Sequence, residues 1–251
     1  MSHIELSKLD TRAPDNVNRE EIEAEFEQIR EEIVELQQKF YADGRHSLLI
    51  VLQGMDASGK DGTVRHVFYG VNPLGIRVYP YGKPTDEEAK HDFLWRLHVN
   101  TPKKGMISIF NRSYYEDILV PTVEGYIEKD LIERRYDHIN NFEEMLRDNG
   151  TIVLKFFLHM SKDMQRERLD ERMEERKKNW KHHASDEVVR KKWEDYMEVY
   201  EDVFKKTNTK HAPWHIIPTD DKWYKVYLVA KTIRDTLKEL DLQWPELSDE
   251  V

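Results

Sequence analysis

A glycine-containing loop with a single lysine follows a short apolar run near the start of the chain. The run at 48–52 is β-branched at its centre and predicts a buried strand, and a helix is expected to open near Asp61. The sequence between them, GMDASGK, fits GxxxxGK, in which backbone N–H groups and a helix N-terminus surround an anion. A turn that only caps a helix is the alternative. The predicted phosphate-binding residues are Gly54, Ala57, Ser58, Gly59, Lys60, Asp61, Gly62 and Thr63.

Two acidic residues make this loop unusual. Asp61 follows the lysine, where Ser or Thr normally binds Mg²⁺, and Asp56 lies inside the loop. A carboxylate beside phosphate repels it unless a cation lies between them. We therefore interpret Asp56 first, and Asp61 second, as evidence for a phosphate bridged by a metal ion.

A second cluster, NRSYYED at 111–117, follows the third predicted strand. Ligands of open parallel sheets bind outside the carboxyl ends of the strands, so Arg112, Glu116 and Asp117 are expected to face the loop at 54–63. Phosphoryl transfer needs an acid that holds Mg²⁺ and a cation that neutralises charge on the transferring group. The alternative is a loop of salt bridges without a catalytic role.

A third cluster is basic. Its cations are Arg166, Arg168, Arg172, Arg176, Lys177, Lys178 and Lys181, followed by His182 and His183. No acid occurs from Arg176 to His183. Such a stretch on a mobile lid suits closure over a phosphate chain, while a solvated helix with paired charges is the alternative. The adjacent histidines point apart on a helix and predict no metal site.

The rest of the chain must position these clusters. Strands are predicted at 48–52, 76–79, 106–110, 151–158 and 213–218, and helices are predicted after Asn18 and over 62–69, 85–98, 125–148 and 222–240. This alternation predicts an α/β fold with a parallel sheet. No linker or repeat is visible, so we expect one domain over 1–251, with an N-terminal helical arm at 1–44 and a helical lid at about 161–206.

Composition limits the partners. A net charge of −10 argues against a nucleic-acid partner, so a polyanionic substrate needs local clusters of Lys and Arg. No apolar stretch approaches the roughly 18–20 residues that span a bilayer, and the N-terminus has no signal-peptide core. The chain has no cysteine, which fits a reducing compartment. We expect a cytoplasmic protein that does not bind membranes.

Four stretches resemble the polyphosphate kinase 2 family. They are QGMDASGKDGT at 53–63, GVNPLGIRV at 70–78, FNRSYYEDILV at 110–120 and ERMEERKKNWK at 171–181, with Pro213-Trp214 and Lys222-Trp223-Tyr224 after them. The Glu116-Asp117 pair is similar to the class III branch, which is associated with phosphorylating both AMP and ADP. The resemblance implies a thymidylate-kinase-like P-loop fold in three layers, polyphosphate as the donor, Mg²⁺ with Mn²⁺ as an alternative ion, and a homo-oligomer, either a tetramer or a dimer.

The resemblance also implies roles for single residues. Lys60 and the loop amides would hold phosphate, and Arg112 and Arg172 would steady the transferring group. Asp56, Glu116 and Asp117 would be the metal-side acids, with Glu116 also a candidate for orienting the acceptor. The residues implied near the nucleotide are Asn72, Pro73, Lys83 and Arg112, and those implied near polyphosphate in the lid are Arg176, Lys177, Lys178 and Lys181.

Two positions depart from the family pattern. Asn111 stands where one branch has Asp, and Glu175-Arg176 stands where relatives often carry an Asn-Pro or Asp-Pro step, so we expect a more continuously helical lid. The function predicted is reversible, Mg²⁺-dependent, in-line transfer from polyphosphate to AMP or ADP. The alternatives are a nucleoside monophosphate kinase that uses ATP and a sensor that binds nucleotide or polyphosphate without turnover.

Overall fold

Five parallel strands form one sheet in this computed structural model, which describes residues 4–181 and 185–247. The strands are β1 (Ser47–Gln53), β2 (Ile76–Pro80), β3 (Ile107–Asn111), β4 (Thr151–His159) and β5 (Trp214–Pro218), in the order β2-β3-β1-β4-β5. The register pairs Leu52 of β1 with both Asn111 of β3 and Phe156 of β4. The carboxyl ends of the strands therefore share one edge of the sheet, as the sequence predicts.

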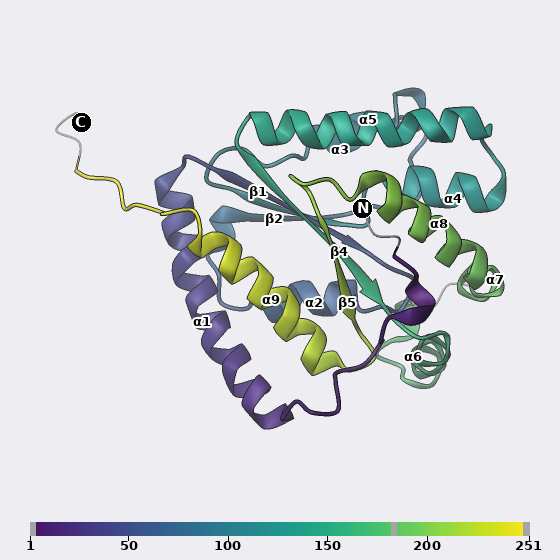
Figure 1. Cartoon of the computed structure of the whole chain (residues 1–251), viewed down its shortest axis with the longest axis horizontal. Coiled ribbons are helices and arrows are strands. Elements are labelled where there is room, and N and C mark those ends of the chain that lie inside the picture. Colours follow the sequence, from purple (N-terminus) through teal and green to yellow (C-terminus); the bar gives the residue numbers. More distant parts are fainter. Residues whose placement is uncertain (1–3, 182–184, 248–251) are drawn as a thin grey trace.

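Helices cover both faces of the sheet, which gives three layers (Figure 1). Leu49 and Val51 of β1 point to one hydrophobic cluster, and Leu48, Ile50 and Leu52 point to the other, because side chains alternate along a strand. The first face carries α3 (Trp95–His98), α4 (Glu116–Glu124), α5 (Lys129–Asp148) and α8 (Trp193–Thr207). The second carries α1 (Arg19–Asp43), α2 (Lys60–Val67) and α9 (Lys222–Lys238).

The remaining elements lie beside the carboxyl edge or in connections. The helices α6 (Lys162–Glu174) and α7 (Ser185–Lys191) follow β4 and lie beyond the strand ends in Figure 1. Short 3₁₀ turns span Leu6–Lys8, Pro73–Gly75, Glu88–Lys90 and Asn179–Lys181. Within the two described ranges, no helix is long and apolar enough to cross a membrane.

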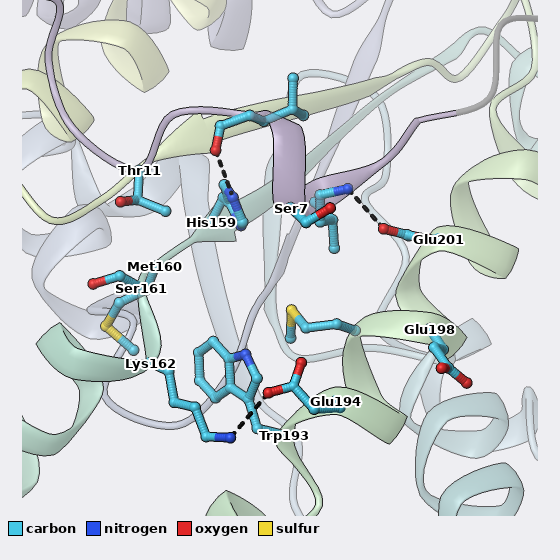
Figure 2. A pocket seen from close by; sticks show the side chains of 13 residues that line it. Ser7, Thr11, His159, Met160, Ser161, Lys162, Trp193, Glu194, Glu198 and Glu201 are labelled. Carbon is cyan, nitrogen blue, oxygen red and sulfur yellow. Dashed lines mark hydrogen bonds and ion pairs between the residues drawn. The ribbon is translucent and has the colours of Figure 1, made fainter.

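The N-terminal helix belongs to the core. Asn18 caps α1 by accepting from the Glu20 N–H at 3.0 Å, and Gly44 ends it in the left-handed conformation. Ile29 and Ile33 are buried in the cluster that α9 shares. The residues before α1 cross the carboxyl edge, where the Leu6 N–H donates to Glu201, and they cover a hollow of about 300 Å³ against α8 (Figure 2).

The prediction of one helix over 85–98 is wrong. Thr85 and Glu88 form a reciprocal cap, at 2.8 and 3.2 Å, but only the turn Glu88–Lys90 follows it. Asp92 then accepts from the N–H groups of Leu94 and Trp95, and α3 begins at Trp95. A side chain that competes for backbone N–H groups divides the segment.

Two other helix boundaries differ from expectation. The helix predicted over 125–148 begins only at Lys129, and an unpredicted helix, α4, occupies Glu116–Glu124 and ends at Gly125 with φ 68°. The expectation of a more continuous lid helix is also wrong. The helix α6 stops at Glu174, and Glu175 is extended, so the chain leaves the helix just before the basic stretch.

Ile33→Ala should destabilise the protein by about 2–5 kcal/mol, because it leaves a cavity where α1 packs on the core. Chemical denaturation measures the loss. Glu35→Ala, on the exposed side of the same helix, is the control and should stay within about 0.5 kcal/mol of the unchanged protein. Equal stability of the two variants would mean that α1 is not part of the folded core.

Candidate active site

The loop between β1 and α2 is curved by residues with positive φ. Gly54 has φ 145°, and a Cβ on it would lie 2.9 Å from the Leu158 carbonyl oxygen, so a larger residue does not fit. Ala57 has φ 67°, and Gly59 at φ 92° caps α2. The first N–H groups of α2 have no acceptor within the helix and are available to an anion. The Lys60 ammonium donates to the carbonyls of Gly54 and Met55, at 2.7 and 3.2 Å.

Arg112 connects the second cluster to this loop. Its backbone N–H donates to the Leu52 carbonyl at 3.0 Å, and its φ of 64° is unusual for a residue with a side chain. Its guanidinium forms an ion pair with Asp56, and its Nε lies 3.9 Å from Glu116 Oε1. The structure therefore brings Asp56, Lys60, Arg112 and Glu116 together, although they come from the ends of two different strands.

Burial and charge shift the pKa values of these groups in different directions. For Asp56, burial acts to raise the pKa, but Arg112 and Lys60 outweigh it and the pKa falls. For Glu116, burial dominates and raises the pKa against the opposing effect of Arg112 and Lys60. Burial, helped by Arg112, lowers the pKa of Lys60 to about 8. Asp56 is therefore the more readily ionised of the two acids.

Asp117 faces a different direction from the other two acids. Its carboxylate lies 3.5 Å from Arg96, and its backbone carbonyl accepts from Arg135. Burial raises its pKa, partly opposed by Arg96 and Arg135. Among the described residues, no three His, Cys, Asp or Glu side chains are grouped to hold a metal ion. Asp56 and Glu116 remain as candidate metal ligands. Two carboxylates fit Mg²⁺, because this ion is often held by one or two carboxylates together with waters and substrate phosphates.

A groove of about 890 Å³ opens beside the loop, and most of its charged residues are cations. Ala57, Gly59 and Gly62 line it from the loop and α2. Its basic side chains are Arg19, Arg65, Arg168, Arg172, Lys177, Lys178, Lys222 and Lys225, against the acids Glu23, Glu27 and Glu171. The groove can accept an extended anion that ends at the loop.

Two cations in the groove also hold the loop in place. Arg168 donates to the carbonyls of Ala57 and Thr219, at 3.2 and 2.6 Å. Lys225 donates to the Gly59 carbonyl at 3.3 Å, and burial, together with nearby Arg168, lowers its pKa to about 7. Lys222 and Lys225 are not among the site residues predicted from the sequence. Their place in the first turn of α9, the helix that follows β5 at the carboxyl edge, was the signal that could have identified them.

Several predicted site residues do not meet the others. Asn72 and Pro73 precede β2, at the amino edge of the sheet, and five residues of strand at about 3.3 Å each separate them from the carboxyl edge. The structure therefore places these two residues away from the loop and from Arg112, and their role near the nucleotide stays a prediction. Asn72 caps the turn Pro73–Gly75. They were predicted because they belong to the stretch GVNPLGIRV at 70–78, which in this structure forms the turn before β2.

Of the other predicted site residues, some line the groove and some lie outside it. Lys83 follows β2 at the carboxyl edge and is exposed, and Arg176 is exposed outside the groove lining. Lys177 and Lys178 do line the groove, and Lys178 also pairs with Glu171 at 2.8 Å. Asp61 accepts from the Asn111 amide at 2.7 Å, which ties the start of α2 to the end of β3. The side chain of Lys181 lies outside the described residues, as do His182 and His183.

The strand order, the glycine loop after β1 and the helix that begins at Lys60 define a P-loop kinase. The model of the family Polyphosphate kinase 2 matches residues 16–245. The chain therefore belongs to the polyphosphate kinase 2 family.

Known proteins agree with this assignment. The AMP/ADP-polyphosphate phosphotransferase of Meiothermus ruber is 49% identical over 211 residues, which cover 84% of this chain and 79% of that protein. The ADP-polyphosphate phosphotransferase of Rhodopseudomonas palustris is 42% identical over 86% of this chain and 79% of its own length. The crystal structure of polyphosphate kinase 2 from Arthrobacter aurescens matches with a TM-score of 0.95 at 38% identity, over 100% of this chain and 91% of that one.

Binding of tripolyphosphate should take up protons at roughly pH 7 to 9. Without an anion, Lys225 and Lys60 lose their charge as the pH rises through about 7 and about 8. A bound anion favours the protonated ammonium and therefore raises the pKa of both lysines. Because binding is then coupled to proton uptake, the affinity for the anion should fall as the pH rises. Isothermal titration calorimetry in buffers of different ionisation enthalpy measures the uptake. The control Lys60→Met/Lys225→Met should take up fewer protons, because proton exchange by the ligand itself is common to both proteins. Equal uptake by that control would contradict the prediction.

Proposed function

We propose that this protein transfers the terminal phosphoryl group of inorganic polyphosphate directly and reversibly to AMP or ADP, with Mg²⁺ as cofactor. The observation that carries the proposal is the contact of Arg112 with both Asp56 and Glu116. Asp56 belongs to the phosphate-binding loop, and the next residue of that loop, Ala57, lines the basic groove. Carboxylates beside a phosphate site suit bound cations. Membership of the family and the names of the two relatives support the same reaction.

Each group in the candidate site has a proposed role. The loop amides and Lys60 hold the phosphates, and Asp56 and Glu116 hold Mg²⁺, which neutralises developing charge when bound. Arg112 steadies the transferring group while it stays within reach of both acids. Glu116 begins α4 and is also the candidate that orients the acceptor. Transfer is in line, without a covalent enzyme intermediate, and catalysis consists of positioning and charge neutralisation.

Asp117 has a supporting role in this proposal. Its contacts with Arg96 and Arg135 lie on the side of α3 and α5, away from the groove. We propose that Asp117, Arg96 and Arg135 shape the binding site of the nucleotide acceptor, which extends toward Lys83. Polyphosphate would occupy the groove on the opposite side of the loop. Donor and acceptor would then meet at Arg112.

The helical segment from α6 to α8 is the proposed lid. Arg172 lines the groove and donates to Asp186 of α7 at 3.2 Å, so one lid helix positions a cation of the other. Closure of the lid would add Arg172, Lys177 and Lys178 to the phosphate chain and exclude water that would hydrolyse it. We propose that the lid and the N-terminal helix belong to one kinase domain over 1–251.

The donor is tested by product analysis. Purified protein with Mg²⁺ is given AMP or ADP together with either long-chain polyphosphate or ATP, and nucleotides are separated by chromatography. Products formed from polyphosphate support the proposal, and products formed only from ATP would favour a nucleoside monophosphate kinase. Binding without turnover in either case would indicate a sensor. A homo-oligomer, tetramer or dimer, stays a prediction that light scattering can measure in the same preparation.

Lys60→Ala should lower kcat with polyphosphate by at least about 100-fold, because it removes an ammonium from the phosphate loop. Initial rates of ATP formation from ADP measure the loss. Lys103→Ala is the control, since Lys103 is exposed before β3 at the opposite edge of the sheet. Unchanged turnover in Lys60→Ala would refute the assignment of the loop.

Lys222→Gln should raise the KM for long-chain polyphosphate several-fold while the KM for ADP changes little. Lys222 is exposed on the groove, so the substitution removes one ionic interaction with the chain. The dependence of KM on salt should also become shallower, by analogy with nucleic acids, where the salt slope scales with the number of phosphates that the protein neutralises. Lys129→Gln, at the exposed start of α5, is the control. A larger effect on ADP than on polyphosphate would contradict the position of the donor.

A further inference from the structure

A buried ion pair lies beneath the candidate site. Lys155 of β4 and Glu143 of α5 are both 0% exposed, and Lys155 Nζ donates to Glu143 Oε2 at 2.8 Å. Removing two charges from water is costly unless their remaining hydrogen-bonding capacity is satisfied. A pair in this position therefore needs further partners, and those partners indicate what the pair does.

Both charges use their remaining capacity on other elements. Lys155 also donates to the Tyr115 hydroxyl at 3.0 Å and to the Thr207 carbonyl at 2.7 Å. Glu143 Oε1 accepts from the hydroxyls of Tyr114 and Tyr115, at 2.8 and 2.9 Å. Burial raises the pKa of both tyrosines well above the usual value, so the hydroxyls stay protonated and donate. All three lysine donors and both carboxylate oxygens have partners.

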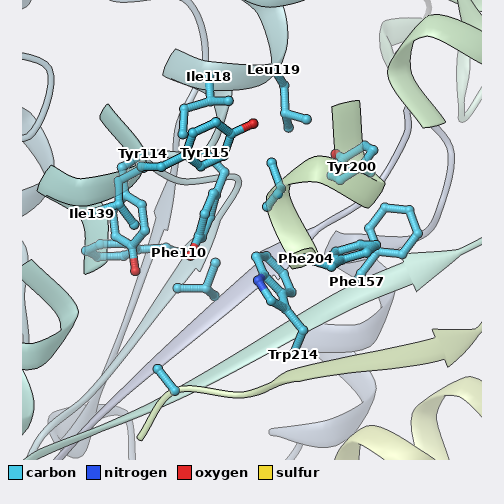
Figure 3. Packing of buried hydrophobic residues seen from close by; sticks show 14 of the residues in the cluster. Phe110, Tyr114, Tyr115, Ile118, Leu119, Ile139, Phe157, Tyr200, Phe204 and Trp214 are labelled. Carbon is cyan, nitrogen blue, oxygen red and sulfur yellow. The ribbon is translucent and has the colours of Figure 1, made fainter. Parts of the chain in front are cut away.

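The two tyrosines lie between the proposed catalytic residues. Arg112 precedes them and Glu116 follows them, and their fully buried rings pack in the cluster that also holds Trp214 (Figure 3). The preceding Ser113 is held as well, since its Oγ accepts from Gln53 Nε2 at 3.1 Å. The turn at 112–116 is thus fixed at successive residues, which can hold the unusual φ of Arg112.

The hydrogen bond from Lys155 to Thr207 connects the ion pair to the proposed lid. Thr207 is the last residue of α8, the final helix of the proposed lid, after which the chain continues toward β5. Its hydroxyl accepts from Trp214 Nε1 at 2.9 Å, so the end of α8 is attached both to β5 and to Lys155. One ammonium group therefore contacts the turn that carries Arg112 and the base of the lid helix.

We propose that Glu143 and Lys155 are positioning residues, which fix the turn at 112–116 relative to the end of α8 and thereby set the geometry of phosphoryl transfer. Neither residue lines the groove, so substrate binding should depend on them little. A purely structural pair would affect stability alone. This inference rests on the proposed phosphoryl transfer for its kinetic readout.

The test uses Glu143→Gln/Lys155→Met in the full chain. This double variant leaves no unpaired charge, keeps an acceptor for the tyrosine hydroxyls, and leaves the Thr207 carbonyl its bond from the Thr209 N–H. We expect kcat to fall by about 10- to 100-fold, since small displacements of reacting groups carry losses of that size. The KM for polyphosphate should stay within about twofold. Hydrogen exchange at the amides of 112–117 should become faster.

Ile139→Ala is the matched control. Ile139 is fully buried on α5 in the same cluster but has no part in the ion pair. Its replacement by Ala should therefore lower stability while the hydrogen bonds from the ion pair to the turn remain. The proposal is overturned if the double variant loses no more kcat than this control, or if its loss is entirely in KM. If the double variant does not fold, Tyr115→Phe carries the test, because it removes the bonds from the tyrosine hydroxyl to both members of the pair.

Failure of the proposed function is distinguishable from failure of this inference. If the unchanged protein transfers no phosphoryl group, the function fails, and hydrogen exchange at 112–117 still decides whether the pair holds the turn. Exchange that is equal in the double variant and the control would refute the positioning role in either case.

Discussion

One guanidinium holds two carboxylates beside a loop that is shaped to surround phosphate. Arg112 contacts Asp56 from the loop and Glu116 from the start of α4, and without this cation two half-buried acids would lie close together with no positive charge between them. Their pKa values reflect the arrangement, since that of Asp56 is lowered and that of Glu116 is raised. The acids, the arginine and Lys60 form one charge-balanced unit, and the surrounding fold has to place all four within reach of one another.

The parallel sheet provides that placement. The ends of β1 and β3 are adjacent in the register, so the loop after one strand meets the turn after the other. The end of β5 adds Lys222 and Lys225 on the far side of β4, and α6 adds Arg168, whose guanidinium binds carbonyls of both the loop and the segment after β5. The basic groove is built from four separate segments: α1, the loop with α2, α6 with the residues that follow it, and the start of α9. This gathering of cations from distant parts of the sequence explains how a chain with a net charge of −10 can present a strongly cationic surface.

Support for the site extends deep into the protein. The Glu143–Lys155 pair joins α5 to β4, and its further hydrogen bonds go to Tyr115 in the turn that carries Arg112 and to Thr207 at the end of α8. Buried charges are expensive in free energy and add little stability over an apolar core, so a fully bonded pair is more informative about geometry than about stability. The same core that stabilises the fold is in this way connected to both the proposed catalytic turn and the proposed lid.

The sequence alone determined the elements and motifs that local chemistry controls. The apolar run before GMDASGK, the cap at Asn18 and the alternation of strands and helices predicted the α/β class, the loop and the helices α1, α2 and α9, because hydrophobic periodicity and capping act over a few residues. Tertiary structure decided which distant residues meet. It separated Asn72 and Pro73 from the site, turned Asp117 toward Arg96, and added Lys225 and Arg168 to the loop. Those outcomes depend on strand register and on which helix packs on which face, and these are set by the whole core.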